Sequence, residues 1–299
     1  NKQKLCDHPN KIKDGGGVLA FGYVDLQRAT NNFSEKLGGG GFGNGILSDT
    51  NTIAVKTLDG ARQGDKQFRA EISTIGNDST WNLVKLIGFC CERDKRMLVY
   101  EHMVNRSLDA ICFEALNCRD CIIHCDVKPE TILLDEAFVP KIADFGMAKL
   151  VGREFSRVLT TMRGTVGYLA PEWISGVAIT QKVDVYSYGM VLLEIISGRR
   201  NSLVECTSNS DQAIYFPVQA ASKLIQGDVQ SLLDQQLQGE INMHEVETAC
   251  KVACWCIQES EFYRPTMGEV VQVLEGLVDF SMPPMPRLLQ TILGSSAAP

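Results

Sequence analysis

The sequence of 299 residues lacks an apolar run long enough to cross a bilayer, and it lacks an excess of positive charge. Its most apolar stretch, Met190 to Ile196, is interrupted by Glu194 and is far shorter than the ~20 residues of a membrane span. The net charge is -7, so the chain offers no concentrated basic face for a phosphate backbone. These absences argue against a membrane span in this chain and against nucleic acid as a partner.

A regular cysteine framework is also lacking, although the sequence has eleven cysteines. Their odd number and irregular spacing predict free thiols in a reducing, intracellular compartment. Cys118 and Cys121 form one CxxC, and Cys254 lies close to Cys256. No second CxxC or spaced histidine pair completes four metal ligands, so a structural zinc site is the lesser alternative.

The composition, 44% hydrophobic and 22% charged, is that of a globular protein with a sizeable core. The first hundred residues hold short β-like runs at 52–56 and 97–100. Between them, 66–75 has the spacing of one helical segment. Beyond about Met103 the pattern is mostly helical, and 183–197 is apolar nearly all round, as in a buried helix. We therefore expect an α+β fold with a small, β-rich N-lobe that has one helix and a larger, mainly helical C-lobe.

Four segments follow from these patterns. The start of the chain is basic and rich in glycine, which is typical of a linker, and either a membrane anchor upstream or an arbitrary boundary explains why it begins at Asn1. We predict a juxtamembrane-like linker at 1–32 and the N-lobe at 33–102. The C-lobe is predicted at 103–281 and a C-terminal tail at 282–299.

A glycine motif opens the N-lobe. Gly38, Gly40 and Gly43 form GxGxxG, which lets backbone amides approach phosphates closely but is a weak signal alone. A dinucleotide-binding unit would continue directly into a helix, whereas 44–52 holds turn residues and leads into a strand. The pattern favours a hairpin flap, and a dinucleotide-dependent enzyme is the alternative.

A lysine closes the strand that follows this motif. From the end of the strand, the Lys56 ammonium can reach the α- and β-phosphates of a nucleotide. Glu71, on the predicted helix, can form an ion pair with it. The alternative is an ordinary surface lysine, but the glycine motif a suitable distance upstream favours nucleotide binding.

The most informative segment begins with His124-Cys125-Asp126. It places the Asp126 carboxylate where it can accept the proton of an attacking hydroxyl, and Lys128 where it can neutralise a γ-phosphate. Asp144, in Asp144-Phe145-Gly146, supplies a carboxylate for Mg²⁺ bridging the β- and γ-phosphates. Each acid alone could lie in a solvated turn, but their order and spacing predict phosphoryl transfer.

A further pair of charges is predicted downstream. The segment from Gly164-Thr165 to Glu172 is expected to position a peptide substrate, and Arg264 offers Glu172 a buried ionic partner. The alternative for Arg264 is a surface charge at a helix end.

These motifs together, from Phe21 to about Leu289, resemble the plant S-domain (lectin-type) receptor-like kinases. The resemblance implies a bilobal protein-kinase fold that uses ATP with Mg²⁺ or Mn²⁺, with Tyr100 as gatekeeper and Glu101 to Met103 as the hinge that holds adenine. Lys128 with Gly164-Thr165 is the serine/threonine form rather than the tyrosine form.

The resemblance also implies partners and supporting residues. It implies protein substrates, action as a homo- or heterodimer of receptor kinases, and a place on the cytoplasmic side of the plasma membrane through a segment outside this chain. It assigns Thr160, Thr161 and Thr165 to the activation segment, and Asp184 with Arg264 to structural roles.

Two substitutions depart from the family pattern. Cys125 replaces the arginine that in many kinases binds a phosphorylated activation loop, as in the non-RD class, so phosphorylation at Thr160, Thr161 or Thr165 need not be the switch. Thr131 replaces the asparagine that coordinates a second Mg²⁺, and a hydroxyl is a poorer, shorter ligand.

Two segments are shorter than the family's. The hairpin after Gly43 is about three residues short, which predicts a flap that closes badly. The segment between Glu101 and His124 is about two dozen residues shorter, which leaves too little length for the family's two helices and predicts a shortened C-lobe. These departures support an alternative function, a pseudokinase or signalling scaffold with impaired phosphate transfer.

Overall fold

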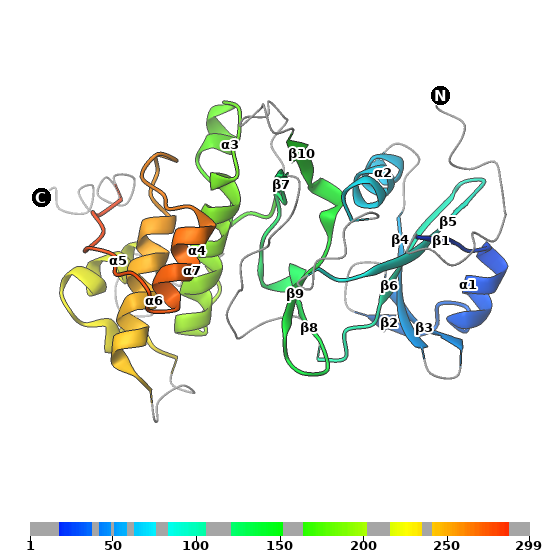
Figure 1. Cartoon of the computed structure of the whole chain (residues 1–299), viewed down its shortest axis with the longest axis horizontal. Helices are drawn as coiled ribbons and strands as arrows, with labels where there is room; N and C mark the ends of the chain where they lie inside the picture. The colour runs from blue at the N-terminus through cyan, green and yellow to red at the C-terminus, as the bar shows by residue number, and fades with distance from the viewer. Residues whose placement is uncertain are drawn as a thin grey trace, which may run out of the picture. The chain divides into compact units, whose positions relative to one another are not determined.

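The computed structural model describes residues 18–37, 42–48, 51–58, 63–75, 83–105, 121–151, 164–201, 216–234 and 241–286. The chain forms two compact units (Figure 1). The first takes in the described residues up to 105 together with 121–122 and 130–150, and the second takes in 123–129 and the described residues from 151 onward.

A six-stranded sheet forms the body of the first unit, in the order β1-β5-β6-β4-β3-β2. Neighbouring strands are antiparallel except β1 and β5, which are parallel. The close approach of β1 depends on Gly88, because a Cβ there would lie 2.4 Å from the Leu19 carbonyl oxygen. The strands are Leu19–Ala20 (β1), Lys36–Leu37 (β2), Phe42–Ser48 (β3), Asn51–Thr57 (β4), Leu86–Glu92 (β5) and Lys95–Glu101 (β6).

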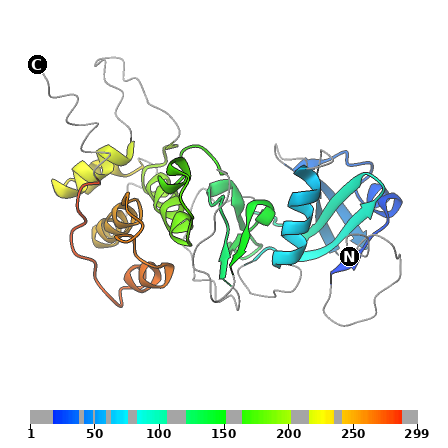
Figure 2. The same ribbon diagram turned by 90° about the horizontal axis from the view of Figure 1, so that it is seen from above.

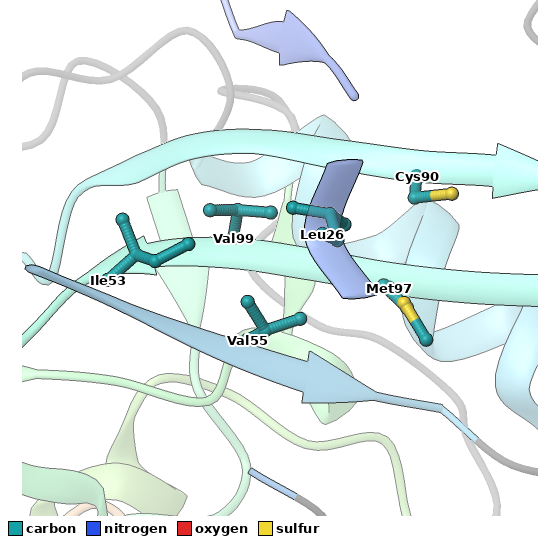
Figure 3. Close-up of a cluster of buried hydrophobic side chains, with 6 residues drawn as sticks. All are labelled: Leu26, Ile53, Val55, Cys90, Met97 and Val99. Atoms are coloured by element: carbon teal, nitrogen blue, oxygen red, sulfur yellow. The ribbon is translucent and has the colours of Figure 1, made fainter. Parts of the chain in front are cut away.

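Two helices cover the two faces of this sheet. Successive side chains of a strand point to opposite faces, so Val55 of β4 points to one face and Lys56 to the other. Helix α1 (Tyr23–Ala29) packs on the first face and α2 (Gln63–Ile75) on the second (Figure 2). Leu26 of α1 is fully buried in a core cluster, shown in Figure 3 with its other members Ile53, Val55, Cys90, Met97 and Val99.

The rest of the first unit carries short elements that follow the sheet in sequence. Strands β8 (Ile132–Leu134) and β9 (Pro140–Ile142) form an antiparallel pair, and the Val84 amide donates to the Ile142 carbonyl at 3.0 Å. The short helix η2 (Phe145–Met147) follows β9 and packs against α2. The Val84–Ile142 hydrogen bond and the contact of η2 with α2 therefore attach the turn at Asp144 to the unit that holds the sheet. Three further short elements each contain residues of both units, namely β7 (Cys121–Ile123), η1 (Pro129–Thr131) and β10 (Lys149–Val151).

The described part of the second unit is mainly helical. Helix α6 packs against α4, α5 and α7. Most side chains of α4 are buried, and it ends at Gly198, whose φ of 65° suits glycine and whose amide donates to the Glu194 carbonyl. The elements are α3 (Glu172–Ser175), α4 (Lys182–Ser197), α5 (Phe216–Ile225), η3 (Val229–Leu232), α6 (Met243–Cys256) and α7 (Met267–Leu274).

The predicted α+β class is confirmed, with one unit built on a sheet and the other mainly helical. The β-like runs at 52–56 and 97–100 lie in β4 and β6, and the predicted helices lie in α2 and α4. Part of the predicted linker at 1–32 is structured, since it holds β1 and α1. The shortened segment of the C-lobe falls largely on 106–120, outside the described residues.

The cysteines partly follow the prediction. Five of them are free and buried, namely Cys90, Cys125, Cys250, Cys254 and Cys256. Cys91, however, is disulfide-bonded, so the prediction of free thiols is wrong there. The odd number and irregular spacing of the cysteines argue against a regular framework of disulfides, but they do not exclude a single disulfide.

The described ranges also bear on metal binding and on membrane spans. Within those ranges, no group of three or more His, Cys, Asp or Glu side chains is placed to hold a metal ion. None of the helices that the structure describes is both long and apolar enough to span a membrane.

Replacing Leu26 by alanine tests the contribution of α1 to the core. The side chain is fully buried, so Leu26→Ala is expected to lower the free energy of unfolding by about 2–5 kcal/mol. Urea unfolding measures this loss. Val24→Ala on the same helix is the control, because Val24 is 61% exposed and should cost under about 0.5 kcal/mol. Equal losses in the two variants would contradict a core role for Leu26.

Candidate active site

A buried lysine lies between two carboxylates in the first unit. The Nζ atom of Lys56 lies 2.7 Å from Glu71 Oε1 and 2.7 Å from Asp144 Oδ1. Lys56 extends from β4 toward α2, where Glu71 is fully buried. Asp144 has a left-handed backbone, with φ of 66°, at the turn between β9 and η2. The structure thus brings Lys56 and Glu71 together, as the sequence predicts, and adds Asp144.

The charges of this group are strongly coupled. Burial alone would lower the pKa of Lys56, but the Glu71 and Asp144 carboxylates outweigh it and raise that pKa above its ordinary value. Burial raises the pKa of Glu71 to about 7, since Lys56 offsets the burial only in part. The Tyr100 hydroxyl also donates to Glu71, a contact that the prediction of Tyr100 as gatekeeper did not include. Lys56 therefore stays protonated at neutral pH, while Glu71 titrates near it.

The glycine motif is only partly within the described residues. Gly38 and Gly40 lie outside them. Gly43 lies in β3 directly opposite Val55, so it belongs to the sheet face that α1 covers. A Cβ at Gly43 would meet the Phe33 ring at 3.4 Å. Because facing residues of paired strands share a face, Gly43 and the Lys56 side chain lie on opposite faces of the sheet.

The predicted hinge begins where β6 ends. The Glu101 carboxylate accepts from the Lys85 amide at 2.8 Å and from Lys141 Nζ at 3.3 Å. These contacts tie the end of β6 to the segment before β5 and to β9. Met103 follows two residues later, outside the strand and half-buried.

The predicted metal-binding residues lie in the same unit. Thr131 is 3% exposed at the end of η1, and its carbonyl accepts from the Ala143 amide at 2.8 Å, beside Asp144. Mg²⁺ is commonly held by one or two carboxylates together with substrate phosphates. Asp144 suits one such ion, whereas the neutral Thr131 hydroxyl is a weak ligand for a second.

The second unit holds the other predicted catalytic pair. Asp126 is 5% exposed, and its Oδ2 accepts from Lys128 Nζ at 2.9 Å. Its Oδ1 accepts from the Thr165 hydroxyl at 2.7 Å, and that hydroxyl accepts from Lys128 at 2.8 Å. The resemblance assigned Thr165 to the activation segment, but its contact with both predicted catalytic residues was not foreseen. The other predicted threonines, Thr160 and Thr161, lie outside the described residues.

A buried carboxylate fixes the backbone next to Asp126. Asp184 at the start of α4 accepts from the amides of His124, at 2.6 Å, and Cys125, at 2.9 Å. Burial raises the pKa of Asp184, and the His124 and Cys125 contacts counteract that shift. Cys125 is left-handed, with φ of 69°, a conformation disfavoured for a residue with a Cβ. Asp184 thus stabilises a strained backbone that orients Asp126, which supports its expected structural role.

Arg264 and Glu172 form the buried pair that the sequence predicts. Arg264 donates to the two carboxylate oxygens of Glu172 at 2.5 and 2.8 Å. Its guanidinium also donates to three backbone carbonyls, those of Lys182, Gln258 and Glu259. Arg264 is 2% exposed, so the alternative of a surface charge does not hold.

One buried group was not predicted. In the sequence, Glu194 only interrupts an apolar stretch, but in α4 it accepts from the Tyr168 hydroxyl at 2.8 Å and from the Asn201 amide at 2.5 Å. The charge in an otherwise apolar helix was the signal, because a buried carboxylate needs partners. This contact ties Tyr168, three residues after Thr165, to α4.

Removing Arg264 tests the buried pair. Arg264→Met leaves the Glu172 carboxylate uncompensated, so the free energy of unfolding should fall by about 3–5 kcal/mol. Adding Glu172→Gln should recover part of this loss. Urea unfolding measures both variants, with Arg199→Met on the exposed surface as control. A loss for Arg264→Met no larger than that of the control would refute a stabilising pair.

The raised pKa of Glu71 predicts a pH effect on stability. Because the folded-state pKa, about 7, exceeds the ordinary 4.5, the folded chain binds a proton before the unfolded chain does as pH falls. This carboxyl therefore stabilises the fold progressively as pH falls from about 7 toward 4.5. Melting temperatures of wild type and Glu71→Gln, compared across this window, should show the wild type gaining relative to the variant. A constant difference would contradict the raised pKa.

Comparison with known families gives two matches. Residues 112–274 match the protein kinase domain, and residues 31–115 match the family described as protein tyrosine and serine/threonine kinase. The two matches meet at 112–115, inside the segment where the sequence predicts missing residues.

The chain is also similar to curated plant proteins. A G-type lectin S-receptor-like serine/threonine-protein kinase of Arabidopsis thaliana is 53% identical over 95% of this chain and 38% of its own length. Another from Arabidopsis thaliana, SD2-2, is 47% identical over 95% of this chain and 40% of its own length. LECRK4 of Oryza sativa subsp. indica is 38% identical over 89% of this chain and 37% of its own length.

Two facts follow from these alignments. The chain spans about two fifths of the length of the curated relatives it matches. The first alignment is longer than the chain, 318 positions against 299 residues, so this chain lacks residues that the relative has.

Proposed function

This chain belongs to the protein kinase family, and from that premise we propose that it transfers the γ-phosphate of ATP to serine and threonine hydroxyls of proteins. The relatives reported above are all named as serine/threonine-protein kinases, so they give no support to the pseudokinase alternative. The proposal covers the activity of this domain within a longer receptor-like kinase.

The observation that carries the proposal is the environment of Asp126. Its carboxylate accepts from the Thr165 hydroxyl at 2.7 Å, which is the contact that a catalytic carboxylate must make with a serine or threonine acceptor. Lys128 lies 2.9 Å from the same carboxylate and brings a positive charge beside it. A carboxylate and an ammonium in contact can accept a hydroxyl proton and neutralise a phosphate at neighbouring points.

We assign the following roles to the residues. Asp126 orients the acceptor hydroxyl and accepts its proton as the oxygen attacks the γ-phosphorus and the bond to the β-phosphate oxygen breaks. Lys128 neutralises charge on the γ-phosphate in transfer. Lys56, held by Glu71, binds the α- and β-phosphates. The bond that forms is a phosphate ester on the protein, and ADP is released.

A divalent metal completes this set. Mg²⁺ or Mn²⁺, when bound, supplies charge that stabilises the phosphates, and Asp144 is the residue suited to hold it. Asp144 keeps a fixed position because Lys56 contacts its Oδ1 at 2.7 Å. Thr131 would supply only a hydroxyl where the family has an asparagine, so we propose that the domain holds a second ion weakly.

Substrate, partners and location rest on the relatives' names. We propose protein substrates, because a protein kinase acts on proteins, and pairing with another receptor kinase. We also propose a place on the cytoplasmic side of the plasma membrane, through a segment outside this chain. The acidic net charge of -7 accords with a protein rather than nucleic acid as the partner.

Phosphate transfer from labelled ATP tests the proposed function. The purified chain, with Mg²⁺ or Mn²⁺, should label itself or a generic basic protein, and Asp126→Asn should reduce the initial rate at least about 100-fold. Circular dichroism of both proteins checks that they are folded. A folded wild type with no more transfer than Asp126→Asn would favour the pseudokinase.

Restoring the family's asparagine extends the same assay. Thr131→Asn is expected to raise turnover up to about 100-fold if the second metal ligand limits the rate. The gain should be largest at low Mg²⁺ concentration, and Thr131→Ser is the matched control because it keeps a hydroxyl. Equal rates for the two variants would show that Thr131 does not limit transfer.

A further inference from the structure

A strained turn joins α1 to β2. Asn31, Asn32 and Phe33 are all left-handed, with φ of 47°, 60° and 56°. Three consecutive residues with side chains rarely adopt this conformation, and a bulky side chain such as phenylalanine disfavours it further. Such strain persists only where the surroundings hold it in place.

Hydrogen bonds from α1 hold this turn. The Thr30 hydroxyl donates to the Leu26 carbonyl at 2.8 Å and accepts from the Phe33 amide at 3.1 Å. The Asn32 amide donates to the Gln27 carbonyl at 2.8 Å, and the two side chains bond at 2.7 Å. The turn is therefore a fixed extension of the helix.

The turn and the end of α1 contact β3, the strand that follows the glycine motif. A Cβ at Gly45 would lie 2.8 Å from Thr30 Cγ2 and 3.0 Å from the Ala29 carbonyl oxygen. The φ of Gly45 is not in the left-handed region, so close approach rather than backbone conformation requires glycine here. At Gly43 the Phe33 ring takes the corresponding place, 3.4 Å from a Cβ.

Strand β3 has little support at its outer edge. Among the described residues, its partner there, β2, pairs with Phe42 and Gly43 alone. Beyond that, the Asn44 amide donates to the Glu35 carbonyl at 2.9 Å, and the Asn44 side chain donates to that of Glu35 at 3.1 Å. The segment 29–35 thus contacts three consecutive residues of β3, from both its face and its edge.

We propose that Thr30 and Phe33 are positioning residues, which hold β3 through Gly45 and Gly43 and so set how the glycine motif meets ATP. The inference rests on the proposed function, because it assumes that the chain binds ATP. Thr30 lies before residue 31, where the family match begins. The core role of α1 belongs to Leu26, so a test at Gly45 and Thr30 separates positioning from simple core packing.

The test adds a methyl group at Gly45 and then removes the Thr30 methyl group that it would meet. Gly45→Ala in the full chain should raise the KM for ATP roughly 10-fold, with a smaller effect on kcat, because displacing a binding strand by about 1 Å is costly. Thr30→Ser removes Cγ2 but keeps the hydroxyl that holds the turn, so alone it should raise KM much less than Gly45→Ala does. In the double variant, KM should return at least halfway to the wild-type value on a logarithmic scale, because the clash with Cγ2 is relieved. The recovery should be incomplete, because the added methyl group still meets the Ala29 carbonyl oxygen.

A second measurement does not depend on phosphate transfer. Amide hydrogen exchange over 43–47 without nucleotide should quicken in Gly45→Ala and slow again in the double variant. Ile46→Thr, on the same strand but 57% exposed, is the control and should leave exchange there close to wild type. Unchanged exchange in Gly45→Ala, or a double variant identical to it, would overturn the proposal.

Binding of a non-hydrolysable ATP analogue with Mg²⁺, measured by calorimetry, separates the two proposals. A wild type that binds the analogue but transfers no phosphate would refute the proposed function alone, and the affinities of the variants would then replace KM. A wild type that binds no analogue would overturn both. If amide exchange over 43–47 changes between the variants as expected but their affinity for the analogue does not, the positioning role would be overturned.

Discussion

The buried ammonium of Lys56 holds the first unit's site together. It lies 2.7 Å from a carboxylate of α2 and 2.7 Å from one in the turn after β9, so three separate elements meet at a single charge. Without that charge, Glu71 would be a buried acid that has lost its cationic partner, and the coupling between the helix and the turn would be lost. The sheet, α2 and the β8–β9 pair are therefore linked by electrostatics as well as by packing.

Two carboxylates of the second unit, unlike the buried Glu172 that pairs with Arg264, are held by neutral donors. Asp184 and Glu194, both on α4, accept backbone amides and a hydroxyl rather than pairing with a buried cation. One fixes the backbone before Asp126, and the other holds Tyr168 after Thr165. This largely buried helix thus organises the segments on both sides of the proposed catalytic pair, and its burial makes those contacts rigid.

Much of the fold and site could be predicted where a residue's role depends on local sequence. The strand that carries Lys56 and the helix that carries Glu71 have clear hydrophobic periods, so the contact between these two residues could be predicted from sequence order. The contact of Thr165 with Asp126 could not be predicted, because it depends on how a distant segment folds back. The face of Gly43 depends on strand register, and a change of one residue reverses it. Helix α1 was missed since, of its seven residues, only Leu26 is buried.

The pairing of β1 with β5 has a consequence for comparing related sequences. Gly88 leaves the space that the Leu19 carbonyl and the Phe21 ring occupy, and a Cβ would lie 2.3 Å from that ring. A side chain at this position would force the Leu19 backbone and the Phe21 ring to move away from β5. Glycine at this one position therefore decides where the sheet ends, because without β1 the outer strand on that side would be β5.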